Sequence, residues 1–199
     1  MPFYKGQDGK HLKLYRGECN HPHYKVPKAF PRAMYFGELS TAEAYSEYES
    51  QTGDYYTSRI FEVHLVLNRP FIDQPQDPFL EMGAVAQRLG LSEARRIAIR
   101  FAKYIEETDN WQLEINPDKK YKGVADYIHA PIGDVTKLYF QAYRFFDSLM
   151  EVRRLKLLGY DGAIHAGSGS ASEGKVEYCV FDQKQVYFTA SKSFFDGNE

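Results

Sequence analysis

Arg16 is the first residue whose type and setting could do chemistry. It ends an apolar strand, and Gly17 follows it. A guanidinium fixed in this way can bind a pyrophosphate through parallel hydrogen bonds, and a glycine lets backbone approach a ligand closely. An arginine at a strand end is more often a solvated edge residue, so this segment predicts an anion-binding residue only together with other evidence.

A second segment is aromatic. Tyr35 and Phe36 precede Gly37, and the predicted helix that follows carries Tyr45 and Tyr48. Aromatic faces beside a turn of small residues suit a flat heterocycle. Packing of Tyr35 and Phe36 in the core is the alternative interpretation of the same pattern.

A third candidate is Glu177, which lies in an apolar strand directly after a loop rich in Gly and Ser, residues 166–174. A carboxylate mounted on a rigid element can stabilise positive charge that develops during a reaction. An acid on an edge strand that discourages aggregation would give the same pattern.

Periodicity and capping signals predict the elements that must position these residues. Strands are expected at residues 10–15, 60–67, 160–165, 176–181 and 185–189, and a short segment at residues 33–37. Helices are expected at residues 42–49 and 79–89, after a cap at Ser92, and from about residue 135 to Gly159, whereas residues 111–127 read as irregular. Strands, then helices, then strands again indicate an α+β fold. We predict a single domain, residues 1–199, with a helical insertion at about residues 79–157.

Composition narrows the class of protein. The chain has 199 residues, 16% of them aromatic, which excludes a disordered chain. A net charge of −2 predicts no broad surface for polyanions, so a protein partner is favoured over nucleic acid. Cys19 and Cys179 are too few for a disulfide framework, although one disulfide between them stays open. No secretion signal or membrane span is recognisable, so we expect a cytoplasmic protein without membrane contact.

In their order, the three segments resemble the motifs of the ADP-ribosyltransferase superfamily, which are an Arg or His strand, a Tyr or Ser motif and a late Glu. Tyr15-Arg16-Gly17 resembles the first motif of the arginine-type branch found in many bacterial toxins. Tyr35-Phe36-Gly37-Glu38 with Ser40 is more similar to the histidine–tyrosine branch, which includes the poly(ADP-ribose) polymerases.

The end of the chain strengthens the resemblance. Residues 158–162 followed by residues 177–182 resemble the C-terminal motif of phage and mobile-element ADP-ribosyltransferases, and residues 63–72 resemble a strand of those proteins. The resemblance covers about residues 10–73 and 155–190. It implies a split β-sheet core and a phage or bacterial effector, whose location could be a host cytoplasm.

The resemblance also implies a reaction. The enzyme would bind NAD as its substrate, cleave the nicotinamide–ribose bond and transfer ADP-ribose to a macromolecular acceptor, without a metal. The implied catalytic residues are Glu177, Arg16 and Tyr35. The implied NAD-binding residues are Arg16, Gly17, Tyr35, Phe36, Ser40, Tyr45 and Tyr48, with Tyr35 and Ser40 competing for the middle role. The implied acceptor loop contributes Ser168, Ser170 and Glu173.

One departure from the pattern concerns the acceptor. Toxin-type members usually carry Glu or Gln two residues before the catalytic Glu, where this chain has Lys175, so arginine is disfavoured as the acceptor. Glu173 could substitute for that acid only if the loop folds back.

Three other functions stay open at this point. They are an NAD glycohydrolase, a catalytically silent module that binds protein or nucleic acid, and a metal-dependent hydrolase. The last would need the dispersed histidines His11, His21, His23, His64, His129 and His165, and it is disfavoured because no matching acid cluster accompanies them.

Overall fold

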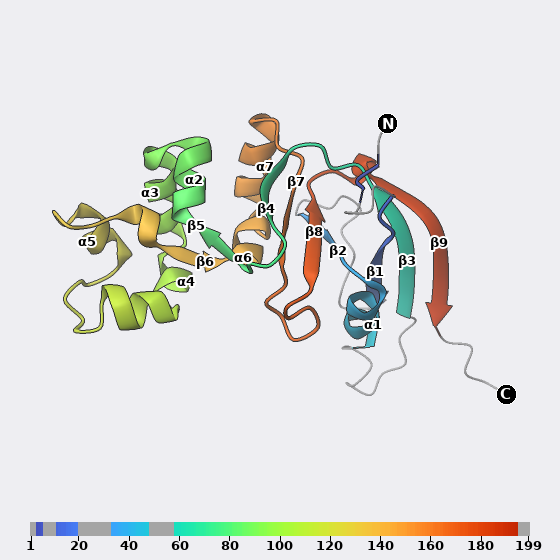
Figure 1. Cartoon of the computed structure of the whole chain (residues 1–199), viewed down its shortest axis with the longest axis horizontal. Coiled ribbons are helices and arrows are strands. Elements are labelled where there is room, and N and C mark those ends of the chain that lie inside the picture. Colours follow the sequence, from blue (N-terminus) through green and yellow to red (C-terminus); the bar gives the residue numbers. More distant parts are fainter. Residues whose placement is uncertain (1–2, 6–10, 20–32, 48–57, 195–199) are drawn as a thin grey trace. The chain divides into compact units, whose positions relative to one another are not determined.

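The computed structural model describes residues 3–5, 11–19, 33–47 and 58–194, with backbone alone at residues 18–19, 47, 58 and 190–194. The chain divides into two compact units, one formed by residues 1–78 and 146–199 and the other by residues 79–145 (Figure 1). Strands and helices occur in both units, so the protein has an α+β composition, as the sequence predicts.

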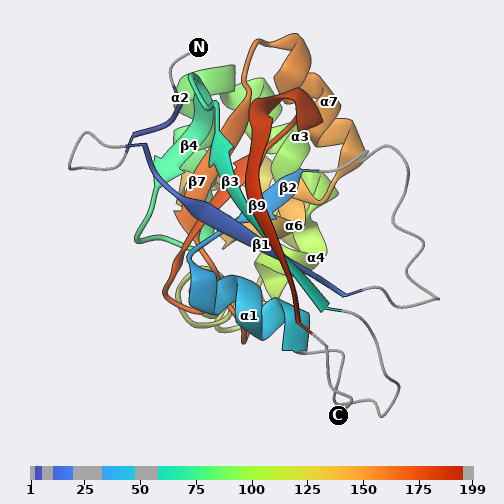
Figure 2. The same cartoon turned by 90° about the vertical axis from the view of Figure 1, so that its right-hand side faces the viewer.

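The first unit contains two sheets. The smaller has the order β1-β3-β9, with β1 at Leu14–Cys19, β3 at Ser58–Leu65 and β9 at Val186–Phe194, all antiparallel (Figure 2). The larger has the order β2-β8-β7-β4, with β2 at Met34–Phe36, β8 at Val176–Val180, β7 at Gly162–Ala166 and β4 at Pro70–Gln74. The β4–β7 pair is parallel, whereas β8 pairs antiparallel with β2 and β7.

The two sheets share one hydrophobic core. It is built from Leu14, Val63, Leu65 and Val186 of the smaller sheet, from Met34, Phe36, Ile164 and Val180 of the larger one, and from Leu67. Successive side chains of a strand point to opposite faces, so the burial of Met34 and Phe36 turns Tyr35 away from this core. The backbones of Tyr15 and Gly37 join the sheets by two hydrogen bonds of 2.8 and 3.0 Å.

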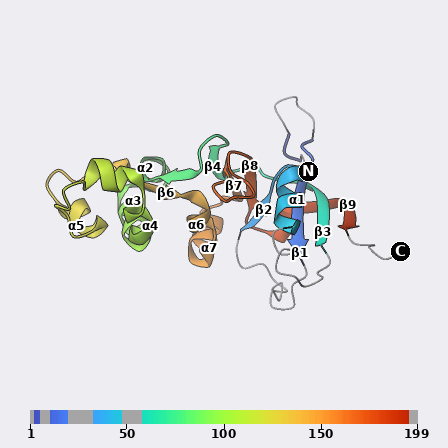
Figure 3. The same cartoon turned by 90° about the horizontal axis from the view of Figure 1, so that it is seen from below.

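Two helices complete the first unit. Helix α1, Leu39–Glu47, lies against β1 (Figure 3) and begins three residues before the predicted start at residue 42. Helix α7, Leu149–Leu157, is followed by Gly159, whose φ of 83° suits the turn into β7.

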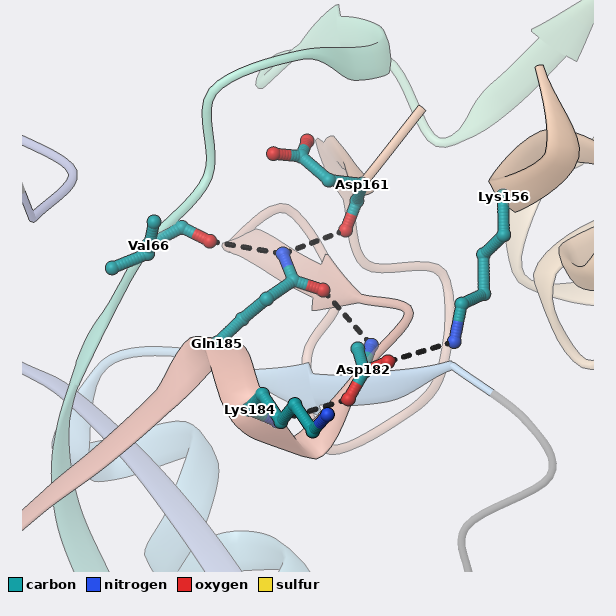
Figure 4. Close-up of polar contacts among 6 residues, drawn as sticks. All are labelled: Val66, Lys156, Asp161, Asp182, Lys184 and Gln185. Carbon is teal, nitrogen blue, oxygen red and sulfur yellow. Dashed lines mark hydrogen bonds and ion pairs between the residues drawn. The ribbon is translucent and has the colours of Figure 1, made fainter. Parts of the chain in front are cut away.

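A side-chain amide ties together the connections between these elements (Figure 4). Gln185 ends a short 3-10 helix, Gln183–Gln185, and its Nε2 donates to the carbonyl oxygens of Val66 (2.9 Å) and Asp161 (2.8 Å). Its Oε1 accepts from the Asp182 backbone N–H at 2.9 Å, and the Asp182 carboxylate pairs with Lys156 at 3.0 Å. These contacts hold α7 close to the segments that follow β3, precede β7 and follow β8.

The second unit is mostly helical around a two-stranded sheet. Strand β5, Phe79–Glu81, pairs antiparallel with β6, Tyr139–Gln141. The helices are α2 (Met82–Leu89), α3 (Leu91–Arg100), α4 (Ala102–Glu106), a π-helix (Asn110–Ile115), α5 (Val124–His129), a 3-10 helix (Val135–Lys137) and α6 (Ala142–Phe146), whose last residue belongs to the first unit. In the core, Phe101 stacks on Phe140 with ring centroids 4.8 Å apart.

Several element predictions are wrong. The continuous helix expected from about residue 135 to Gly159 is a 3-10 turn, a strand and two short helices, because Phe140 pairs with Leu80 in the β5–β6 ladder. The helix expected at residues 79–89 begins with the partner strand, β5, and only residues 82–89 are helical. Strand β1 also lies later than the predicted residues 10–15, so Arg16 is inside the strand and not at its end.

The Gln185 amide leads to a first prediction. Gln185→Ala should lower the free energy of unfolding by about 1–3 kcal/mol, since it leaves two carbonyl groups and one N–H without their side-chain partner. Urea denaturation measures the loss, with Gln183→Ala as the matched control on the exposed side of the same turn. Equal stability of the two variants would contradict the role assigned to the amide.

Candidate active site

Strand register places Tyr35, His165 and Glu177 on one face of the larger sheet. Tyr35 is paired with Cys179 across β2–β8, and His165 is paired with Glu177 across β7–β8. Paired residues share a face, and so do Glu177 and Cys179, which are two positions apart on β8. This face is opposite to the one that carries Met34 and Phe36 into the core.

Glu177 is held by a tyrosine of α1. Its side chain is 5% exposed, and its Oε1 accepts a hydrogen bond of 3.3 Å from the Tyr45 hydroxyl. The same hydroxyl lies 3.4 Å from Oγ of Ser172, which is buried, whereas Tyr45 itself is 45% exposed. The helix after the second motif, the Gly/Ser-rich loop and the strand of the third motif therefore meet at one hydroxyl group.

The Gly/Ser-rich loop is folded onto itself. Gly167 N–H donates to the Lys175 carbonyl at 2.8 Å, and Ser172 N–H donates to the Gly169 carbonyl at 2.9 Å. A Cβ on Gly167 would come within 2.3 Å of the Ser172 hydroxyl, so only glycine fits there. The predicted acceptor residues divide by exposure: Ser168 is half-buried, whereas Ser170 and Glu173 are exposed.

Tyr35 keeps its proton. Burial raises the pKa of its hydroxyl well above the ordinary value, and the nearby Cys179, Asp147, Glu177 and Tyr45 raise it further. The Tyr35 hydroxyl is therefore a neutral hydrogen-bond donor at every physiological pH.

His165 lies on the same face of the sheet, although the sequence analysis named it only among the dispersed histidines of a metal-dependent hydrolase. Its ring is 1% exposed, stacks on Phe146 at 5.8 Å and meets the Tyr35 ring edge-on at 5.9 Å. Burial lowers the pKa of His165, opposed by its hydrogen bond to Ala166 and by the negative charges of Glu177 and Asp77. No local signal marks this residue, since its pairing with Glu177 depends on strand register.

Arg16 lies where the two sheets join. Its Nη1 donates to the backbone carbonyl of Tyr35 at 3.2 Å, and its guanidinium carbon lies 5.9 Å from the centroid of the Phe36 ring. Phe36 is 3% exposed and packs in the shared core. Gly17 lies beneath α1, where an added Cβ would be 2.0 Å from the Ala42 carbonyl oxygen, so its lack of a side chain makes room for the helix.

Ser40 belongs to an ionic cluster at the start of α1. Its hydroxyl donates to Glu38 at 2.6 Å and accepts from Lys175 Nζ at 2.9 Å, and Lys175 pairs with Glu38 at 3.2 Å. These hydrogen bonds from Ser40 and Lys175 lower the pKa of Glu38. Lys175 thus ties the end of the loop to α1.

Tyr48, the last of the predicted NAD-binding residues, lies outside the described residues.

Within the described ranges, no cluster of three or more His, Cys, Asp and Glu side chains could hold a metal ion. His21 and His23 lie outside those ranges. None of the helices described is long and apolar enough to cross a membrane.

Comparison of the chain with protein-family models, with curated proteins and with solved structures finds no match.

The close approach of α1 to β1 gives a second prediction. Gly17→Ala should lower the free energy of unfolding by about 1–3 kcal/mol, because the new methyl group overlaps the Ala42 carbonyl and the helix must move. Gly169→Ala is the control, since its Cβ would have no neighbour closer than 3.8 Å. If thermal and urea denaturation show the same stability for Gly17→Ala and for this control, the packing of α1 does not depend on Gly17.

The buried imidazole gives a third prediction, on pH. The unfolded chain protonates His165 below about pH 6.5, whereas the folded protein, with a lowered pKa, resists protonation. The unfolded state then binds more protons, so stability falls as the pH drops below 6.5, by up to about 1.4 kcal/mol per pH unit. Urea denaturation from pH 7.5 to 5.0 measures this slope. His165→Phe should flatten it, and an unchanged slope would refute the assignment.

Proposed function

We propose that the protein is an NAD-dependent ADP-ribosyltransferase, with an ADP-ribosyltransferase-like split β-sheet as the core of its first unit. The observation that carries this proposal is the contact of Tyr45 with Glu177, on the sheet face that also bears Tyr35. Tyr45 and Glu177 lie far apart in the chain, and they belong to the second and third segments on which the resemblance to the superfamily rests.

The chemistry of the reaction fits this arrangement. Cleavage of the nicotinamide–ribose bond develops positive charge on the ribose, and a preorganised carboxylate stabilises that charge. Glu177 is mounted on a β-strand, and in the protein without substrate the Tyr45 hydroxyl holds its carboxylate in place. In the proposed complex it accepts a hydrogen bond from the ribose 2′-hydroxyl.

The other residues of the site bind the rest of NAD. The Tyr35 and Tyr45 rings supply aromatic surface for nicotinamide. Arg16 supplies positive charge for the phosphates or the nicotinamide ribose, from its position at the junction of the sheets. Phe36 and Gly17 act indirectly, because one fills the core and the other admits α1.

The acceptor is proposed to be a macromolecule, with protein favoured over nucleic acid because the chain has no excess of positive charge. Ser170 and Glu173 are exposed on the loop that precedes the strand of Glu177, and they are available to contact the acceptor. Lys175 occupies the position of the acid that helps to activate arginine, so an acceptor other than arginine is favoured. A phage or bacterial effector acting in a host cytoplasm is consistent with the resemblance of the C-terminal motif.

Replacement of Glu177 tests the proposal. Glu177→Gln should lower nicotinamide release and target labelling by at least about 10²-fold, the scale expected for one preorganised electrostatic group. Purified protein is incubated with labelled NAD and a bacterial lysate, and labelled macromolecules and free nicotinamide are measured. Glu107→Gln, an exposed carboxylate of the second unit, is the matched control and should keep full activity.

The outcomes separate the functions. Label that depends on Glu177 supports the transferase. Nicotinamide release without label indicates an NAD glycohydrolase, and an active Glu177→Gln variant overturns the assignment of Glu177. No signal with the unmodified protein favours a catalytically silent binding module.

A further inference from the structure

His165 carries a buried hydrogen-bonding atom that the proposed function does not use. Its Nδ1 lies 2.8 Å from the Ala166 carbonyl oxygen, which can only accept, so Nδ1 carries the proton of this bond. In a neutral ring Nε2 is then an acceptor. This Nε2 is buried and has no hydrogen-bond partner among the described residues. A buried acceptor without a partner costs about 1–3 kcal/mol, which favours a donor group arriving there.

The neighbouring strand defines what that donor could be. His165 and Glu177 are directly opposite on antiparallel strands, where Cβ atoms lie about 4.5–5.5 Å apart. The Tyr45 hydroxyl binds Oε1 of the carboxylate. The side chains that carry these two acceptors, an imidazole nitrogen and a carboxylate, are thus cross-strand neighbours on one face of the sheet. A vicinal diol, with hydroxyl donors on adjacent carbon atoms, is the chemical group that matches such a pair.

We propose that His165 and Glu177 together bind the cis-diol of a ribose, with Nε2 of His165 accepting from the 3′-hydroxyl and Glu177 from the 2′-hydroxyl. The inference rests on the proposed function, since it identifies the ribose as the nicotinamide ribose of NAD. His165 is then a substrate-binding residue, and it makes the protein prefer a ribose that carries the 3′-hydroxyl.

Access to this pair requires a side chain to move, because Glu177 and His165 are only 5% and 1% exposed. Tyr45 is the group best suited to do so. It is 45% exposed, and contacts of 3.3 and 3.4 Å to Glu177 and Ser172 hold its hydroxyl in place. An incoming ribose hydroxyl replaces the Tyr45 hydroxyl at the carboxylate, so the buried charge keeps a hydrogen bond throughout.

A pair of ligands tests the inference. The first is an NAD analogue with a cyclopentane diol in place of the nicotinamide ribose, which cannot lose nicotinamide, and the second is its 3′-deoxy counterpart. Calorimetry should show that the unmodified protein binds the diol about three- to ten-fold more tightly than the 3′-deoxy compound, the effect of one hydrogen bond. His165→Phe, which keeps an aromatic ring on Phe146, should bind both compounds equally. His165→Gln, whose Oε1 can accept in place of Nε2, should restore the preference.

The preference between the two ligands distinguishes direct binding by His165 from a purely structural role. If the role were structural, His165→Phe would weaken the binding of both compounds equally. If His165→Phe keeps the preference of the unmodified protein, Nε2 does not bind the 3′-hydroxyl, and the proposed function stands without this inference. A buried water as the sole partner of Nε2 would give that same result. If the unmodified protein binds neither compound, NAD is not its ligand and both proposals fall.

Discussion

The two backbone hydrogen bonds between Tyr15 and Gly37 are the constraint on which the candidate site depends. They join an edge strand of one sheet to an edge strand of the other, and they bring Arg16 to the carbonyl of Tyr35. Next to this junction, Gly17 lets α1 lie directly on β1, and α1 in turn carries Tyr45 to Glu177. A displacement at the junction would therefore move Arg16, Tyr35 and Tyr45 away from Glu177.

The two faces of the larger sheet have opposite chemistry. One face carries Met34, Phe36, Ile164 and Val180 into an apolar core. The other buries the carboxylate of Glu177 and the imidazole of His165 beside the half-buried Tyr35, although buried polar groups reduce stability unless they are well paired. Proteins depart from consistent burial mainly where function requires it. The polar face is therefore a candidate site both because its burial costs stability and because of the residues it carries.

Much of the architecture could be predicted from sequence, because strands such as Val176–Val180 and helix α3 have clear local periodicity. The prediction was wrong where the residues are so fully buried that the spacing of apolar side chains no longer separates a helix from a strand. Leu138, Ala142 and Phe145 are fully buried and fit a helical stripe, yet Phe140 between them pairs in a strand. The pairing of His165 with Glu177 could not be predicted, because it is set by register between strands rather than by neighbours in sequence. Likewise, a helix placed above Gly17 cannot be read from the strand that contains it.

The parallel pairing of β4 with β7 has a consequence for the entropy of folding. The chain between these strands contains the whole second unit, so pairing them in an unfolded chain would close a very long loop. Within that unit, β5 and β6 pair close to its first and last residues and so bring its two ends together. Once the unit has folded, only the short segments on either side of it remain to be closed. Each halving of a loop saves about 0.6 kcal/mol, so the inserted unit lowers the entropic barrier to completing the sheet by about 1 kcal/mol.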